Sequence, residues 1–470
     1  MARPQLPRGK MRGIMEQNSK LIVALLSLAV VAACGDGPAP PAEPGGLAIV
    51  GAQLIDGTGT DPIADSVIVI RDGRVEAAGP RDTTPVPAGA EVIDAGGKTI
   101  IPGLMNLHTH YRGGPEDIKR QMDAQLYYGV TTGRSIGSDS PEAVPFLLEA
   151  NAGRPDLPRA YTAGRGFSAP NGFPPGNDRP QPETTEEARE LVRGLAAEGV
   201  HFTKMWITEM TPPGQIMTPE MRTAIVEESI ANGLVPVAHI DDESHGRQLI
   251  GAGTRDFLHT TVLTFGPGAG APVDDPRPSD EFIQMCLDNG VSFTPTLSII
   301  HNNWHFAENP ELLDDPDLRA VLNPAALERW DNPETRTNTI EADNFEDRKA
   351  AFRQVLDFVK TMHDAGVQIA LGTDAGTANV PMGWGVHHEL ELYVEAGLTP
   401  MQAIVAATAT SAGRMPPVGE ADFGTLEAGK IADLVVLNAD PLADIRNTLQ
   451  IDQVMRLGEW VERDGLLMQP

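Results

Sequence analysis

Six side chains that bind metal ions, or can be converted into a ligand, stand at the ends of short apolar runs along the chain. They are His108, His110, Lys204, His239, His259 and Asp374. Residues i and i+2 of a strand point to the same face, so His108 and His110 can hold one ion together. A single His-x-His pair is weak evidence. The further ligand residues that follow later apolar runs, however, indicate one divalent-metal site assembled from several strands.

The middle of the chain alternates strand-like runs with amphipathic helices such as 218–232 and 346–365. The expected strands are 103–110, 129–136, 160–164, 202–207, 235–240, 257–261, 292–297 and 368–373. The repeated βα unit predicts an α/β fold with a closed (β/α)8 TIM-type barrel, whose strand ends converge on the catalytic face. Two long stretches rich in Pro, Asn and Asp, 264–280 and 302–345, are expected to be loops over that face.

Both ends of the chain have a different character from the middle. Residues 47–101 and 421–470 show short alternating runs with turn signals such as Asp72-Gly73, and no convincing helix appears in the first of them. This pattern is typical of β-structure. We therefore expect a small β-sandwich domain built from both chain ends, beside a barrel at 102–420.

The first 34 residues predict a secretory signal. Five basic residues precede the apolar run 21–33, which is too short for a comfortable membrane span. The run ends in Val31-Ala32-Ala33-Cys34 and resembles a bacterial lipobox, in which the cysteine is lipidated. We expect a lipoprotein signal at 1–34, a flexible tether at 35–46, and a lipid anchor in the bacterial cell envelope, periplasmic or at the cell surface. Ordinary cleavage near Ala33 is the alternative.

The charge of the chain limits its partners. The formal net charge is -29 over 470 residues, and an acidic surface is repelled by phosphate backbones. We therefore expect no nucleic-acid partner. The expected partners are a small-molecule substrate and the membrane, through the anchor at Cys34. Assembly of the chain into a homo-oligomer is a further alternative.

Longer motifs carry a family resemblance. They lie at 102–110, 129–132, 201–206, 372–376, 395–400 and 424–434, and the last reads Gly-Thr-Leu-Glu-Ala-Gly-Lys-Ile-Ala-Asp-Leu. Together they resemble the amidohydrolase superfamily, in particular its imidazolonepropionase-like and prolidase-like branch. The resemblance extends over residues 47 to 465 and implies a metal-dependent hydrolase.

The resemblance also implies roles for the ligand residues. His108, His110 and Asp374 would hold one metal, His239 and His259 the other, and Lys204 would bridge both as a CO2-derived carbamate. Imidazole and carboxylate ligands suit zinc, with manganese, iron or cobalt as alternatives. A metal-bridging hydroxide would attack the carbonyl, and Asp374 would carry its proton to the leaving nitrogen.

Four residues near the strand ends are candidates for substrate binding. His301 and His305 follow the expected seventh strand, Arg165 follows the third, and Trp206 lies near the end of the fourth. The loop 165–172 lacks a histidine that some relatives carry there, which leaves the substrate class open.

We therefore expect a metal-dependent amidohydrolase that cleaves amide, peptide-like carbon–nitrogen bonds, such as a dipeptidase or an N-acyl amino acid hydrolase. One alternative is a mononuclear cyclic-amide hydrolase or deaminase, in which Lys204 is an ordinary strand-end lysine. Another is a catalytically idle binding protein of the envelope. The intact Asp374 argues against the last, because a receptor needs no proton carrier.

Overall fold

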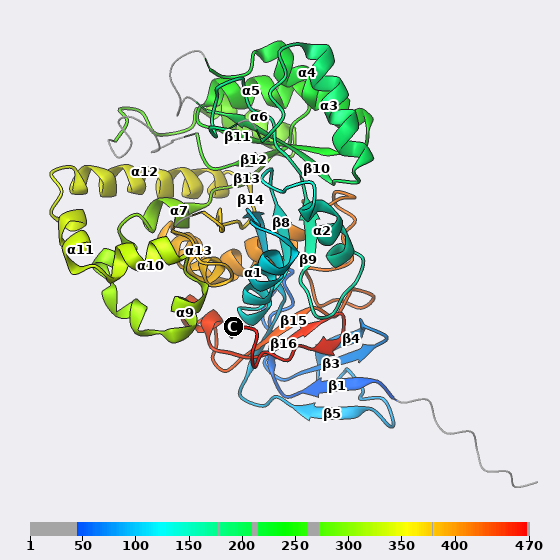
Figure 1. Ribbon diagram of the computed structural model, residues 1–470. Coiled ribbons are helices and arrows are strands. Elements are labelled where there is room, and N and C mark those ends of the chain that lie inside the picture. The colour runs from blue at the N-terminus through cyan, green and yellow to red at the C-terminus, as the bar shows by residue number, and fades with distance from the viewer. Residues whose placement is uncertain (1–44, 177, 209–214, 262–271, 378, 468–470) are drawn as a thin grey trace, which may run out of the picture. The chain divides into compact units, whose positions relative to one another are not determined.

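The computed structural model describes residues 45–467, apart from 177, 209–214, 262–271 and 378 (Figure 1). The expected signal, Cys34 and nearly all of the expected tether lie outside the described residues, as does the first half of the expected loop 264–280. Pro44–Pro470 forms one compact unit. Within the described ranges, no helix combines the length and the apolarity needed to cross a membrane.

Eight parallel strands form the centre of this unit, each within or beside one of the runs expected to be strands. One sheet has the order β7-β8-β9 and the other β10-β11-β12-β13-β14. Their bounds are β7 (Leu104–Thr109), β8 (Val130–Ser135), β9 (Arg159–Thr162), β10 (Phe202–Ile207), β11 (Val235–Ile240), β12 (Asp256–Leu258), β13 (Ser292–Thr294) and β14 (Gln368–Ile369). Nearly every residue of these strands is buried, as is usual for parallel sheets, whose faces are covered.

Backbone hydrogen bonds link the two parallel sheets at both of their edges. After β14, the Leu107 amide donates to the carbonyl of Leu371 at 2.8 Å, and Thr109 forms a parallel bridge with Ala375. After β9, the Phe167 amide donates to the carbonyl of Lys204 at 2.7 Å. The α/β class is confirmed, and the segments that follow β14 and β9 connect one sheet to the other.

Helices follow the parallel strands in sequence. They are α1 (Pro115–Tyr127), α2 (Ala143–Asn151), α3 (Thr185–Ala197), α4 (Pro219–Ala231), α5 (Glu243–Ala252), α6 (Asp280–Asp288), α12 (Phe345–Asp364), α13 (Trp384–Glu395) and α14 (Pro400–Val405), which continues into the π-helical turn η2 (Ala406–Thr410). Thr184, Thr218, Asp242 and Ser279 cap α3 to α6 by accepting a backbone N–H at the first turn. The apolar faces of these helices join the strands in one large core.

The expectation of a loop over 302–345 is wrong. This stretch folds into short helices, preceded by α7 (Leu297–His301): α8 (His305–Glu308), η1 (Pro310–Asp314), α9 (Pro316–Val321), α10 (Pro324–Asp331) and α11 (Pro333–Ile340). The reason is that each Asp-Pro or Asn-Pro pair starts a helix. Asp315, Asn323 and Asn332 accept backbone N–H groups as caps, and the following prolines occupy the first helical position. Phe306, Trp330 and Trp384 anchor the stretch in a cluster of its own.

Strands from both chain ends form two further sheets, shown in blue and red in Figure 1. One has the order β4 (Arg74–Pro80), β3 (Ser66–Arg71), β1 (Leu47–Val50), β5 (Glu91–Asp94); the other has β17 (Glu459–Trp460), β16 (Ile451–Arg456), β15 (Leu434–Leu437), β6 (Thr99–Pro102), β2 (Gln53–Leu54), with η3 (Ile445–Leu449) between β15 and β16. Antiparallel pairing of β6 with β15 joins the two ends of the chain. The two sheets share one apolar cluster, while the domain limits at 102 and 420 stay predictions.

Candidate metal centre

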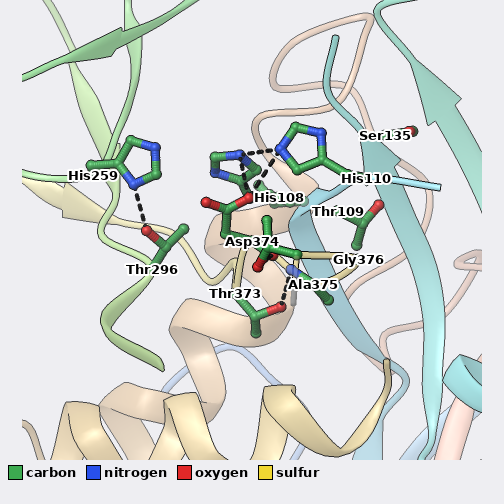
Figure 2. A network of polar contacts seen from close by, with 12 residues as sticks. His108, Thr109, His110, Ser135, His259, Thr296, Thr373, Asp374, Ala375 and Gly376 are labelled. Atoms are coloured by element: carbon green, nitrogen blue, oxygen red, sulfur yellow. Dashed lines mark hydrogen bonds and ion pairs between the residues drawn. The ribbon is translucent and has the colours of Figure 1, made fainter. Parts of the chain in front are cut away.

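Three predicted ligands meet at the carboxyl ends of β7 and β14. The Nε2 atoms of His108 and His110 lie 3.2 Å apart, and the Oδ1 atom of Asp374 lies 3.4 Å and 3.0 Å from them (Figure 2). Ligand atoms in a zinc tetrahedron, about 2.0–2.1 Å from the metal, stand about 3.3 Å apart. The three atoms therefore have the spacing of one face of a metal's coordination shell.

His259 is oriented by a hydrogen bond with the segment after β13. Its Nδ1 lies 2.7 Å from the hydroxyl of Thr296, which also lies 2.7 Å from the carbonyl of Pro295 (Figure 2). When the hydroxyl donates to that carbonyl and accepts from Nδ1, Nε2 carries the lone pair that a metal needs. Histidine ligands are commonly oriented by such a bond at the second ring nitrogen.

Backbone strain is concentrated at the same place. His259, Thr296 and Asp374 have φ of 67°, 54° and 61°, in the left-handed region that side chains with a Cβ rarely adopt. Each such conformation costs on the order of 1–3 kcal/mol and persists only where its surroundings impose it. The fold therefore stabilises an unfavourable backbone to aim these side chains.

His239 and Lys204 complete the group from β11 and β10. The ring of His239 lies 4.1 Å from that of His259, centroid to centroid, and its Nε2 is buried without a hydrogen-bond partner among the described residues. Lys204 has no exposed surface, and its Nζ likewise finds no partner there. Buried polar atoms are almost always hydrogen-bonded, so unpaired nitrogens gathered in one place suit a site made for ions.

The electrostatics of the group favour neutral bases. Burial lowers the pKa of His108, His110, His239 and His259, and the charge of Lys204 lowers each of them further. Burial also lowers the pKa of Lys204, to about 7. Neutral imidazole is the form that binds metal, so these histidines are ready to do so near neutral pH.

Two glycines make room for Lys204 and its neighbour Trp206. A Cβ added at Gly137 would lie 2.7 Å from Cγ of Lys204, and one at Gly166 would lie 2.3 Å from the ring of Trp206. Neither distance is compatible with ordinary packing. The close approach of these loops therefore sets the position of Lys204 within β10.

Gly166→Ala is expected to destabilise the protein by about 1–3 kcal/mol, because the added methyl forces Trp206 and Lys204 to move within a packed core. Equilibrium denaturation and hydrolysis rates check this. Gly194→Ala is the matched control: its Cβ meets nothing within 4 Å on α3, and the substitution should be neutral or stabilising. Equal stability of the two variants would contradict the packing account.

A cavity of about 190 Å³ opens onto these residues. Its lining includes His108, His110, His239, His259 and Asp374, which are five of the six predicted ligands. Trp206, predicted to contact substrate, lines it as well. The cavity therefore gives a small molecule access to the ligand atoms.

The structure places the other predicted substrate contacts elsewhere. Arg165 lines a neighbouring cavity and forms an ion pair with Glu198. His301 and His305 stack on His388, with ring centroids 5.1 Å and 4.1 Å away, and neither lines the cavity of the ligands. The chain turns into α7 after β13, which directs these two histidines into an aromatic cluster, and their position gives no support to substrate contact.

Sequence reasoning missed several residues of the cavity wall. They are Arg112, Ser138, Phe173, Pro174, Ile299 and Thr377. Arg112 and Thr377 stand two and three residues after His110 and Asp374, so their closeness to ligand-bearing strand ends was a usable signal. Phe173 lies far from any strand, and no local pattern marks it.

A parallel α/β fold with histidines, a lysine and a carboxylate at the strand ends defines a scaffold for metal-dependent hydrolysis. Comparison with known proteins agrees, since the sequence model of the amidohydrolase family matches residues 99–461. The protein belongs to the amidohydrolase family. It is a metal-dependent hydrolase of carbon–nitrogen bonds, which confirms the class expected from the sequence motifs.

Individual relatives extend the comparison over nearly the whole chain. A candidate prolidase from Bifidobacterium longum is 28% identical, with a TM-score of 0.69 over 90% of this chain and 98% of its own. An imidazolonepropionase from Rhizobium rhizogenes is 24% identical over 85% of this chain and 90% of its own length. The ochratoxinase of Aspergillus niger is 23% identical over 84% and 81%.

Proposed function

We propose that the protein hydrolyses the amide bond of dipeptides or N-acyl amino acids. The observation that carries this proposal is the convergence of buried ligand atoms, three of them spaced 3.0–3.4 Å apart, on a cavity of about 190 Å³. A cavity of that size admits a small amide and excludes a folded protein. Similarity to a candidate prolidase supports the dipeptide half of the proposal.

Two divalent metal ions, zinc by the chemistry of the ligands, are the proposed cofactors. His108, His110 and Asp374 would hold the first, and the spacing of their atoms supports this assignment. His239 and His259, whose rings are 4.1 Å apart, would hold the second. When bound, such ions lower the pKa of water toward neutrality and polarise the substrate carbonyl.

A carbamate on Lys204 is proposed to bridge the ions. CO2 reacts with a neutral amine, and a pKa of about 7 leaves much of this amine neutral at physiological pH. A protonated Lys204 would repel two cations, whereas the carbamate is an anion with two ligand oxygens. The buried Nζ has no hydrogen-bond partner among the described residues, which suits a group that is completed by modification.

Asp374 is the proposed proton carrier. Its Oδ1 atom faces His108 and His110, which leaves Oδ2 to take the proton of the attacking water and pass it to the leaving nitrogen. Burial alone would raise the pKa of this carboxyl, but the hydrogen bond from His110 and nearby positive groups hold it below its ordinary value. It is therefore ionised and able to accept a proton at neutral pH.

The proposal extends to the fold and to the location. We interpret the two parallel sheets as one closed (β/α)8 barrel, supported by the bridges Thr109–Ala375 and Phe167–Met205. The Val31-Ala32-Ala33-Cys34 motif supports a lipid anchor at Cys34 and a place in the bacterial cell envelope. The proposed partners are then a small-molecule substrate and the membrane.

Hydrolysis of a substrate panel by the metal-loaded full chain tests the proposed function. The panel contains dipeptides, N-acyl amino acids, cyclic ureides, an imidazolone and amino-purines. Release of free amino acid from the first two groups is the expected result. Turnover confined to the cyclic amides or the amino-purines would overturn the proposal in favour of a cyclic-amide hydrolase or a deaminase.

A further inference from the structure

Arg112 lines the wall of the cavity and forms no ion pair with a described residue. It is exposed, and it is the one lysine or arginine among the described residues that line this cavity. Arg165 and Arg179, which line a neighbouring cavity, are ion-paired with Glu198 and Asp178. No carboxylate in the described part of the chain forms an ion pair with Arg112.

The side chain of Arg112 is nonetheless held in place. Its Nε donates to the carbonyl of Gly376 at 2.9 Å. Its backbone N–H and C=O are both bonded to the side-chain amide of Gln121, at 3.2 Å and 2.7 Å. A guanidinium fixed through Nε presents Nη1 and Nη2 as a fork, the geometry that grips a carboxylate with two hydrogen bonds.

The position of Arg112 relative to Asp374 indicates which half of the substrate it would contact. It is bonded to Gly376, two residues after Asp374, whereas Phe173, Pro174 and Trp206 form an apolar part of the wall. Trp206 belongs to β10 and Asp374 follows β14, and these strands are opposite edges of one sheet. The leaving nitrogen, protonated by Asp374, therefore lies on the side of Arg112, and the acyl group lies toward the apolar wall.

We propose that Arg112 binds the carboxylate of the leaving amino acid, and that the substrates are amides with an apolar acyl group and a free carboxylate on the amine half. This inference rests on the proposed amide hydrolysis and narrows it. A side chain that positions a carboxylate acts on substrate affinity, so its loss should raise KM more than it lowers kcat.

The test compares N-acetyl-leucine with N-acetyl-leucinamide, which lacks only the charge. In the wild-type holoenzyme we expect kcat/KM for acetate release to be about 10- to 100-fold higher for the acid, the range of a charge-assisted hydrogen-bonded pair. Arg112→Gln should reduce this preference to below about 3-fold, chiefly through KM. Arg120→Gln on α1, which removes an exposed charge paired with Asp117, is the matched control and should keep it.

Equal rates for acid and amide in the wild type would overturn the role of Arg112 and leave amide hydrolysis standing. If neither compound is hydrolysed, the substrate panel decides the proposed function, and binding of N-acetyl-leucine by calorimetry decides the role of Arg112. Weaker binding in Arg112→Gln than in Arg120→Gln supports it, and equal affinity contradicts it.

A different observation concerns Glu389, a buried carboxylate without a cationic partner among the described residues. It lies on α13 with no exposed surface, and its two oxygens accept the backbone N–H groups of Leu297 and Ser298 at 2.7 Å and 2.8 Å. These amides open α7 directly after Thr296, whose hydroxyl orients His259. Glu389 therefore fixes the start of the segment that holds a predicted ligand.

We infer that Glu389 is a positioning residue for His259, acting through Thr296. An amide at this position would direct an N–H₂ group at a backbone N–H, so Glu389→Gln should release Thr296 from its strained conformation. We expect metal affinity to fall about 10- to 100-fold, as for other residues that orient a ligand. Metal content after dialysis against a weak chelator is the readout, with thermal stability measured in parallel.

Glu391→Gln is the matched control, because it makes the same change two residues along α13, whereas the backbone N–H groups of Leu297 and Ser298 bond to Glu389. Thr296→Ser should keep the metal and Thr296→Val should lose it, which separates the hydroxyl from general folding even if Glu389→Gln is poorly produced. Metal retention by Glu389→Gln equal to that of Glu391→Gln, or by Thr296→Val equal to Thr296→Ser, would overturn the inference.

Discussion

Lys204→Ala is expected to lower kcat/KM for amide hydrolysis by at least about 10²-fold, because metal ions contribute several kcal/mol to the transition state and the lysine is their proposed shared ligand. The side chain is fully buried, and its Nζ forms no hydrogen bond with a described residue. The substitution therefore removes no other described hydrogen bond. Steady-state kinetics on a hydrolysed member of the substrate panel measure the effect.

Controls separate the carbamate from the lysine itself. Lys360→Ala removes an exposed lysine paired with Asp364 on α12 and should leave the rate unchanged. Wild-type enzyme prepared without CO2 should be inactive and should recover on addition of bicarbonate together with metal. Recovery should be faster above pH 7 than below it, because only the neutral amine reacts and the pKa of Lys204 is about 7. Full activity of Lys204→Ala would exclude the bridging role.

Asp374→Asn is expected to lower kcat by about 10²–10⁴-fold, the range found when a positioned proton carrier is removed. The amide keeps the shape of the carboxylate but cannot accept a proton, and it is a poorer ligand beside His108 and His110. Measuring the rates at saturating metal separates the loss of proton transfer from the loss of bound metal. Asp364→Asn, at an exposed carboxylate, is the comparison. A rate for Asp374→Asn within about 3-fold of wild type would exclude Asp374 as the proton carrier.

Much of the fold could be predicted because the physical signals were local. Strands of a parallel sheet are buried on both faces, so runs such as Val235–Ile240 stand out as apolar between polar helix faces. The meeting of His108 with Asp374, more than 250 residues apart, followed from the rule that parallel strands end at one edge. Both predictions needed only the pattern of apolar residues along the chain and the position of each ligand residue relative to its strand.

The rest depended on tertiary context. Asp315-Pro316 and Asn332-Pro333 carry the composition of a loop and the capping chemistry of a helix start. For the first pair, the packing of Leu318 in the cluster of Trp330 favours the helix, and a local reading of the sequence does not show that contact. The left-handed backbone at His259 and Thr296 is imposed by neighbours, so no local propensity predicts it. His301 lies outside the cavity of the ligands because α7 begins at Leu297, directly after Thr296. Glu389, from a helix distant in the sequence, accepts the first backbone N–H groups of α7.

The most direct test of the account is the number of metal ions per chain, measured by inductively coupled plasma mass spectrometry on the full-length holoenzyme and on Lys204→Ala. We expect two ions in the wild type and fewer in the variant, since the variant would lose the proposed ligand shared by both sites. One ion in the wild type, or two retained by Lys204→Ala, would contradict a binuclear centre bridged by this lysine.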